Sequence, residues 1–535
     1  MSEDQRKIVR SGTFSLFTIY STFLLSLLNT ILMARLLSPE NWGILLFALT
    51  VISTASFFCT FFPPGVEGTL QYYVPLFKQD KDDNSLRNFI FHAYKTRLCL
   101  MIFVFIIFHL IIYFLNLNML ITQSLIIISP MIIIAVLQNL NNSLLLAFQK
   151  FKKVFIINFL NPIIYVIGNL IIYLEGLNNP LILIAFIYVF SSSISCFFSI
   201  IYIIRVIPRK RTGSTKSTSS IQNIKYRDIH TKYGLYLTLS GITSNVIGFI
   251  TTSLFLVFGV IAYITFLTIC YTFIEFAENF SGSAKGSFTS IFSEIKIKKG
   301  SHEFKTLIYQ INKYLLFSVS LIVGILFFFM EIIIVLIYTE IYLFVILGIQ
   351  LFLISAFPRV ITRNLLIISH STNRTKLNFY LKVFQSFGNL IVTIIALIFF
   401  GFYTLVLLYF IIILIEPIIG IYLINRKSDL KFSYYLFFKP FLLFLLSFML
   451  IFPLIFFFNF NLFPSIFIIN SFLNGFLKTI IFFFVFYLII YFTKYITKEE
   501  FNQFIKVIPI LRMDRPFIQK ITKLLEKVLP HEKKY

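Results

Sequence analysis

Two pairs of ionisable residues interrupt segments of the chain that are otherwise apolar enough to cross a bilayer. Glu275 and Glu278 are three residues apart, and Arg359 and Arg363 are four apart, so each pair shares one face of a helix. Charged side chains at membrane depth are costly and generally mark a functional site. Two neighbouring carboxylates favour a bound proton or Na⁺, whereas guanidinium groups suit phosphate. We therefore expect ion coupling at the glutamates and a phosphate-bearing substrate at the arginines.

Each pair also has a simpler interpretation. The glutamates can form salt bridges with a neighbouring basic residue such as Lys285, or with Arg359 and Arg363 if the two helices meet. The arginines can anchor the inner end of their helix, because the next loop follows closely. Arg97, at the start of the third apolar segment, is interpreted as an anchor of the same kind.

Three isolated charges complete the candidates. Glu416 precedes Pro417, which would free a backbone carbonyl for an ion or a water; a neutral, hydrogen-bonded glutamate is the alternative. Arg35 ends the first apolar segment, where it contacts substrate, reaches the interface or pairs with Glu40. Glu67 faces either a central cleft or interfacial water. We group Glu416 with the ion-coupling candidates, and Arg35 and Glu67 with the substrate-binding ones.

The sequence offers little support for other chemistries. Four cysteines stand singly in apolar segments, without a CxxC motif or a Cys/His cluster, so neither a metal site nor a disulfide is expected. His109 and His370 stand alone, and there is no HExxH motif or nucleotide-binding glycine string. We expect no catalytic residue, no cofactor and no metal, and thus a protein that is not an enzyme.

The composition identifies the surroundings of these charges as lipid. Of the 535 residues, 58% are hydrophobic and 13% are charged, and 70 are Phe; soluble domains average roughly a quarter charged. Backbone groups in lipid must be satisfied internally, and the apolar runs are continuous rather than alternating. We predict an all-α, polytopic membrane protein with about fourteen transmembrane helices.

The basic residues are distributed asymmetrically. The formal net charge is +24, and nearly all Lys and Arg fall in every second connection between apolar segments. This is the cytoplasmic bias of a membrane protein, so binding to nucleic acid is not expected. Both termini are predicted to be cytoplasmic, in a multi-pass protein of the cell membrane.

A basic stretch rich in Ser and Thr divides the apolar segments into two groups of six. Two halves with an even number of helices have the same orientation, related by a pseudo-two-fold axis along the membrane normal. The tail is predicted to be a basic amphipathic helix, either on the inner leaflet or packed on the cytosolic face. The predicted parts are an N-terminal lobe (1–207), a cytosolic linker (208–231), a C-terminal lobe (232–430), two further helices (431–496) and the tail (497–535).

Local sequence motifs add a resemblance. They are Arg10-Ser-Gly, Ala34-Arg-Leu-Leu-Ser-Pro-Glu-Asn-Trp-Gly43, Pro64-Gly65, Leu70-Gln-Tyr-Tyr-Val-Pro75, Lys313-Tyr314, Ser371–Lys376 and Gly388-Asn-Leu390. Over about residues 5–425 the chain resembles the polysaccharide-transporter and O-antigen flippase families. These belong to the multidrug/oligosaccharidyl-lipid/polysaccharide exporter (MOP) superfamily. Two departures are Glu67, where these families usually carry a small or apolar residue, and the eighth helix, which lacks their proline.

The resemblance implies a flippase that moves a lipid-linked oligosaccharide from the inner to the outer leaflet by alternating access. It implies a monomer with two lobes around a central cavity, and membrane lipids and glycan-assembly enzymes as partners. The alternative is a cation-coupled drug or metabolite antiporter of the same fold, with acids lining a neutral cleft. The first apolar segment has no Asp or Glu between Thr13 and Ala34, which argues against proton-coupled drug antiport. A membrane enzyme would need longer outer loops.

Overall fold

The protein is described as a computed structural model. The described residues are 21–61, 65–67, 70, 74, 83–115, 117–148, 150–177, 179–207, 235–282, 285–338, 340–371, 375–399, 401–427, 431–457, 467–493 and 495. The predicted linker (208–231) and tail (497–535) lie outside this part of the chain, so the structure does not test them.

The regular structure of the described residues is entirely helical. The first half contains the helix Ser21–Leu36, α2 (Pro39–Phe58), α4 (Asp83–Phe114), α5 (Met119–Ile128), α6 (Met131–Ala147), α7 (Phe151–Glu175) and α8 (Pro180–Ile204). The second half contains α10 (Leu235–Val257), α11 (Ala262–Gly282), α12 (Lys285–Ile337), η2 (Glu340–Val345), α13 (Ile346–Ile354), α14 (Ala356–Ser371), α15 (Thr375–Phe399), α16 (Phe402–Lys427), α17 (Tyr434–Phe457) and α18 (Phe467–Thr493).

The number of membrane-crossing segments agrees with the prediction. Twelve helical segments of the described chain are long and apolar enough to span a bilayer, with α5 and α6 counted as one segment, Met119–Ala147. The shorter apolar helix Ser21–Leu36 and the glutamate-bearing α11 are the two further helices that the prediction of about fourteen includes. The predicted all-α polytopic fold is therefore confirmed.

Local sequence explains where several helices begin and end. Ser38 caps α2 by accepting a hydrogen bond from the Asn41 backbone N–H, and Pro39 occupies the first turn, where no amide hydrogen is needed. Pro130 separates α5 from α6. Gly176 ends α7 with φ 58°, in the left-handed region that glycine adopts without a steric penalty.

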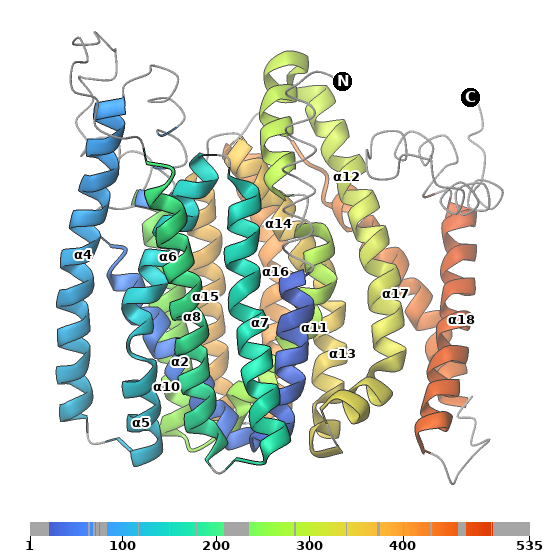
Figure 1. Cartoon of the computed structure of the whole chain (residues 1–535). Coiled ribbons are helices and arrows are strands. Elements are labelled where there is room, and N and C mark those ends of the chain that lie inside the picture. The colour runs from blue at the N-terminus through green and yellow to red at the C-terminus, as the bar shows by residue number, and fades with distance from the viewer. Residues whose placement is uncertain are drawn as a thin grey trace.

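The helices form two lobes in contact. The pair α17 and α18 lies at one edge of the bundle (Figure 1). In the second half, α10 packs on α15, and α12 packs on both α14 and α18. Within the first half, α7 packs on α8, and α8 on α6. The contact between the lobes runs along α2, which packs against both α10 and α11. The pair α17 and α18 lies beyond α12, at the right of the view.

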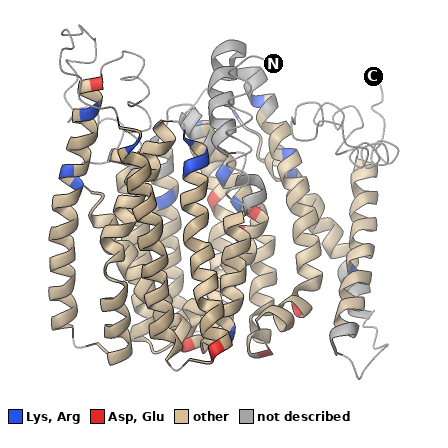
Figure 2. Cartoon of the chain, in the orientation of Figure 1, with Lys and Arg blue, Asp and Glu red and all other residues tan. Residues whose placement is uncertain are grey.

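Charge separates the two ends of the bundle. Figure 2 shows Lys and Arg concentrated towards its upper ends, where α4, α7 and α15 begin. The lower ends carry mainly carboxylates and few basic residues. This is the asymmetry that the alternating basic connections predicted.

Close packing of α12 against α18 provides a test of the helix arrangement. A Cβ atom at Gly324 would lie 2.5 Å from Cε1 of Phe482, whose ring is fully buried. We expect Gly324→Ala to lower the free energy of unfolding by about 2 kcal/mol, because the ring has no free space to move into. Thermal unfolding in detergent measures this. Gly248→Ala is the matched control, because nothing lies within 4 Å of that position; equal midpoints for the two variants would contradict the packing.

Candidate functional site

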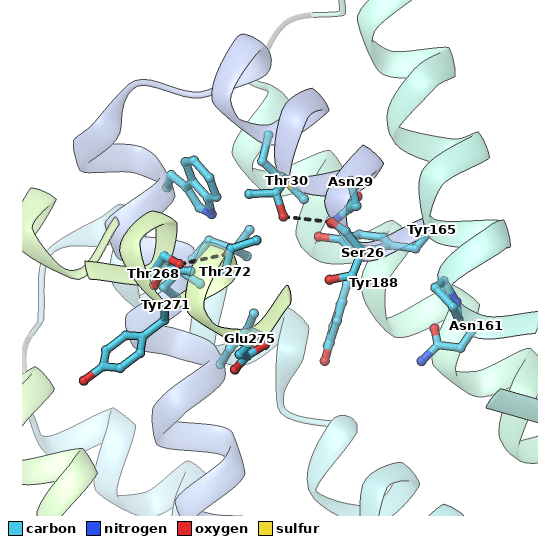
Figure 3. Close-up of a pocket in the computed structure, with 16 residues that line it drawn as sticks. Ser26, Asn29, Thr30, Asn161, Tyr165, Tyr188, Thr268, Tyr271, Thr272 and Glu275 are labelled. Carbon is cyan, nitrogen blue, oxygen red and sulfur yellow. Dashed lines mark hydrogen bonds between the residues drawn. The ribbon is translucent and has the colours of Figure 1, made fainter. Parts of the chain in front are cut away.

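A pocket of about 360 Å³ lies where the two lobes meet. Its walls come from the first helix, α2, α7, α8 and α11 (Figure 3). The side chains from the first helix, α7 and α8 face those of α11 across it. The lining residues are Ser26, Asn29, Thr30, Met33, Trp42, Leu45, Leu46, Leu49, Asn161, Pro162, Tyr165, Tyr188, Thr268, Tyr271, Thr272 and Glu275.

The lining combines uncharged polar groups with a larger apolar surface, and it is almost entirely uncharged. Thr30, Thr268 and Thr272 each donate their hydroxyl hydrogen to the backbone carbonyl four residues earlier, at 2.7–2.9 Å. Their oxygens remain able to accept hydrogen bonds from a ligand. Neither Lys nor Arg is among the lining residues, and Glu275 is their one charged member. Of the seven predicted site residues, the pocket therefore includes only this acid.

The arginine pair lies outside the pocket lining, in an ionic cluster within the C-terminal lobe. The Glu278 carboxylate, 1% exposed, lies 3.4 Å from Nη1 of Arg359 and also pairs with Arg363. The arginine side chains are 16% and 35% exposed, respectively. Helices α11 and α14 do meet, so the salt bridges considered as the alternative from sequence are present. Two guanidinium groups share one buried carboxylate.

The remaining two acids differ in their surroundings. Glu275 is exposed towards the pocket, and Glu278, Arg359 and Arg363 are close enough to interact with it electrostatically. Glu416, in α16, is 4% exposed and interacts electrostatically with Lys382 and Arg359. The three predicted ion-coupling residues and two predicted substrate-binding arginines thus belong to one cluster of α11, α14 and α16.

Tyr271 connects this cluster to the pocket. It lines the pocket, and the guanidinium carbon of Arg359 lies 4.9 Å from the centre of its ring. A cation over a ring face is attracted by the ring quadrupole. In Figure 3 the Tyr271 ring points away from the N-terminal lobe, towards its own side of the pocket. Arg359 is therefore held on two sides, by Glu278 and by Tyr271.

Arg35 and Glu67 lie outside both the pocket lining and the cluster. Arg35 donates a 2.8 Å hydrogen bond to the Leu336 carbonyl in the last turn of α12 and so joins the two lobes. Glu67, 28% exposed on its side chain, pairs with Arg97 at 3.3 Å. The role of each predicted site residue stays a prediction.

Arg97 is a buried charge that the sequence did not indicate. Its side chain is 0% exposed, and it also donates to the Cys59 carbonyl at 2.7 Å. We predicted a helix-end anchor because the apolar run starts there. In the structure α4 begins at Asp83, well before Arg97. The missed signal is the spacing of the buried residues Leu86, Phe89, Ile90, Ala93 and Arg97, which continues one helical face backwards from the apolar run.

The N-terminal lobe also contains a row of uncharged hydrogen bonds. Asn169 donates to Asn29 at 2.6 Å, Ser192 to Asn161 at 3.4 Å and Gln138 to Ser195 at 2.9 Å. Asn141 donates to Ser199 at 2.6 Å. The first two bonds hold the pocket residues Asn29 and Asn161. A signal was available, because Ser191, Ser192, Ser195 and Ser199 share a helical face of α8.

The lobes touch closely at the end of the bundle that carries few basic residues. Thr265 of α11 donates to the Pro39 carbonyl at 2.8 Å. A Cβ atom at Gly43 would lie 2.5 Å from the Ile261 carbonyl oxygen, so only glycine permits this approach. The rings of Trp42 and Tyr342 meet edge to face at 6.5 Å. The two lobes are therefore in direct contact at this end.

The double use of Glu278 predicts unequal effects on stability. We expect Glu278→Gln to lower the free energy of unfolding by roughly 3 kcal/mol, because it leaves both arginines without their carboxylate. Arg363→Gln should cost clearly less, because Glu278 keeps Arg359. Thermal unfolding in detergent compares the two variants. An equal or larger loss for Arg363→Gln would contradict the central position of Glu278.

Comparison with known proteins supports the same fold. The model of the polysaccharide biosynthesis protein family matches residues 8–258, whereas no curated protein sequence matches the chain. The lipid II flippase MurJ, in an inward closed conformation, is 19% identical with a TM-score of 0.60, covering 89% of this chain and 98% of its own. An inward-facing multidrug resistance MATE transporter is 14% identical with a TM-score of 0.60, covering 78% and 97%.

A third solved structure is a transporter of the MOP superfamily from Pyrococcus furiosus, described by the reverse polarity of its binding pocket. It is 14% identical with a TM-score of 0.57, covering 81% of this chain and 98% of its own. At these identities the structural likeness concerns the fold. The predicted resemblance to polysaccharide transporters is thus confirmed by the family match over residues 8–258, and the chain shares the two-lobe, polytopic fold of these solved transporters.

Proposed function

We propose that the protein is a flippase that moves a lipid-linked oligosaccharide from the inner to the outer leaflet of the cell membrane. The observation that carries this proposal is the pocket between the lobes, where amides, hydroxyls and aromatic rings lie beside a single charged residue, Glu275. A sugar carries many hydroxyl groups, and burying them without partners is costly. The pocket offers amides, hydroxyls and aromatic rings in place of water.

The aromatic residues of the pocket support the same assignment. Trp42, Tyr165 and Tyr188 line it together with Asn29 and Asn161. Aromatic side chains combine an apolar face with a polar edge, which suits a sugar ring. The lipid chain of the substrate would remain in the bilayer, so only the head group needs the pocket.

The charge asymmetry supports an orientation. Lys and Arg concentrate towards one end of the bundle, which the positive-inside rule assigns to the cytoplasm. Both termini would then be cytoplasmic. The close contacts at Pro39 and Gly43 lie at the opposite end, which supports a conformation that is closed towards the outside. Alternating access would require these contacts to open.

The arginines retain a proposed role in this scheme. Glu278 engages Arg359 and Arg363, but each guanidinium has five hydrogen-bond donors. Neither arginine lines the pocket, so the donors that remain would meet the phosphate of a carrier lipid outside the pocket lining. We propose Glu275 and Glu416 as coupling residues, because both interact electrostatically with this cluster.

One observation favours a second candidate function. The one charged residue of the pocket lining is Glu275, and a carboxylate at an otherwise neutral pocket also suits a cationic drug or metabolite. An antiporter of the same fold would export such compounds. Efflux of a cationic dye from cells that express the protein, lost in Glu275→Gln, would favour this function.

Proteoliposomes test the flippase directly. We expect faster movement of a fluorescent lipid-linked oligosaccharide between leaflets than in protein-free liposomes, followed with a membrane-impermeant quencher. Thr272→Phe should reduce this rate at least about tenfold, because it fills the pocket. Thr252→Phe is the control, because Thr252 lies in α10, outside the pocket lining. A rate equal to that of empty liposomes, or no difference between the variants, would contradict the proposal.

The contact at Gly43 tests the closed outer end. Gly43→Leu should open the pocket to the outside, because the added side chain collides with the Ile261 carbonyl. In a Thr268→Cys, Cys99→Ala background, an impermeant thiol reagent added outside intact cells should then label Cys faster. Gly248→Leu is the control, because nothing lies within 4 Å of that position. Unchanged labelling in the Gly43 variant would count against the outer contact as a gate.

A further inference from the structure

We infer that the pocket selects a head group containing an amino sugar, a sugar with a positively charged amino group, and discriminates against a sugar acid. This inference rests on the proposed function and adds the substrate class. It comes from the charge of the lining, because Glu275 is the one lining residue of a type that carries a charge at neutral pH.

The two acids of α11 are used differently. Glu278 is 1% exposed and is occupied by two arginines. Glu275, less than one helical turn away, is exposed, and within the described residues it forms no ion pair shorter than 4 Å. It lies centrally among the labelled pocket residues, between Tyr271 and Tyr188 in Figure 3. Its carboxylate is thus available to a ligand.

The positive charges near Glu275 are paired with other groups. Arg359 and Arg363 interact with Glu275 electrostatically, but Glu278 holds both of them. The ring of Tyr271 also lies over Arg359, and neither arginine lines the pocket. A ligand in the pocket therefore meets the Glu275 carboxylate directly and the arginines only across other side chains.

The lining then defines the ligand. An ammonium group donates a charge-assisted hydrogen bond to a carboxylate, which is stronger than a neutral one. The sugar hydroxyls can donate to the threonine oxygens and pair with the Asn29 and Asn161 amides. A sugar carboxylate would instead lie near Glu275, and repulsion between like charges discriminates against it. The volume of about 360 Å³ fits a short glycan.

The single tryptophan of the chain supplies a direct reading of this pocket. Trp42 lines the pocket and is the one Trp in the sequence. Its fluorescence, excited beyond the tyrosine absorption band, should change when a ligand enters. We would titrate the purified full-length protein with the methyl glycosides of glucosamine, glucose and glucuronic acid, and with tetramethylammonium as an amine without a sugar ring.

The glucosaminide should bind roughly tenfold more tightly than the glucoside, and the glucuronide most weakly. Glu275→Gln should reduce the affinity for the glucosaminide to that for the glucoside, and it should leave the affinity for the glucoside unchanged. Glu175→Gln is the matched control, because Glu175 is exposed at the end of α7, outside the pocket lining. This control should bind all four ligands like the unmodified protein.

Three outcomes would overturn the inference: equal affinities for the three glycosides, tighter binding of the glucuronide, or binding of tetramethylammonium as tight as that of the glucosaminide. Absence of any response to a glycoside would overturn it as well. The proteoliposome assay separates these failures from failure of the proposed function. If the protein moves the lipid-linked oligosaccharide but shows no preference for the amino sugar, this inference fails and the flippase function holds. If it prefers the amino sugar but moves no lipid-linked oligosaccharide, the flippase function is refuted.

Discussion

The pairing of Glu278 with two arginines is the interaction on which the C-terminal lobe depends. Lipid does not solvate ions, so a charge placed there must find its counter-charge within the protein. Glu278 supplies one for both Arg359 and Arg363, and Tyr271 covers the first of them. Because α11 also forms a wall of the pocket, the same contacts fix the position of Glu275. Glu275 is thus the charge that a ligand meets because Glu278, and not Glu275, pairs with the two arginines.

In the N-terminal lobe, many of the described polar side chains at membrane depth are paired by uncharged hydrogen bonds. Amides and hydroxyls of α6, α7 and α8 hydrogen-bond to one another, and Asn169 positions Asn29 at the pocket. The ion pair of buried Arg97 with partly exposed Glu67 lies outside the pocket lining. The pocket therefore combines a neutral wall from one lobe with a wall from the other lobe that bears a single acid. This combination is the basis for assigning a sugar ligand.

Much of the fold was predictable from sequence because the length of an apolar run and the spacing of basic connections are set by the bilayer. The glutamate pair of α11 and the arginine pair of α14 were also evident, because helical spacing alone places the two members of each pair on one side of their own helix. The partners were not evident. Whether Arg359 meets a carboxylate or a ligand depends on how two helices distant in sequence pack. Arg97 was missed because hydropathy marks where lipid contact begins, whereas α4 starts earlier, at Asp83.

The hydroxyl row on α8 has a mechanical consequence. Serine and asparagine can exchange hydrogen-bond partners over short distances, and no uncompensated ion is created while they do so. The ionic cluster of the other lobe lacks this freedom, because a small shift of α14 would separate a guanidinium group from the carboxylate that compensates its charge. We therefore expect the two halves to differ in rigidity. The C-terminal half would stay rigid during a transport cycle, and most of the conformational change would occur as α6, α7 and α8 slide against one another.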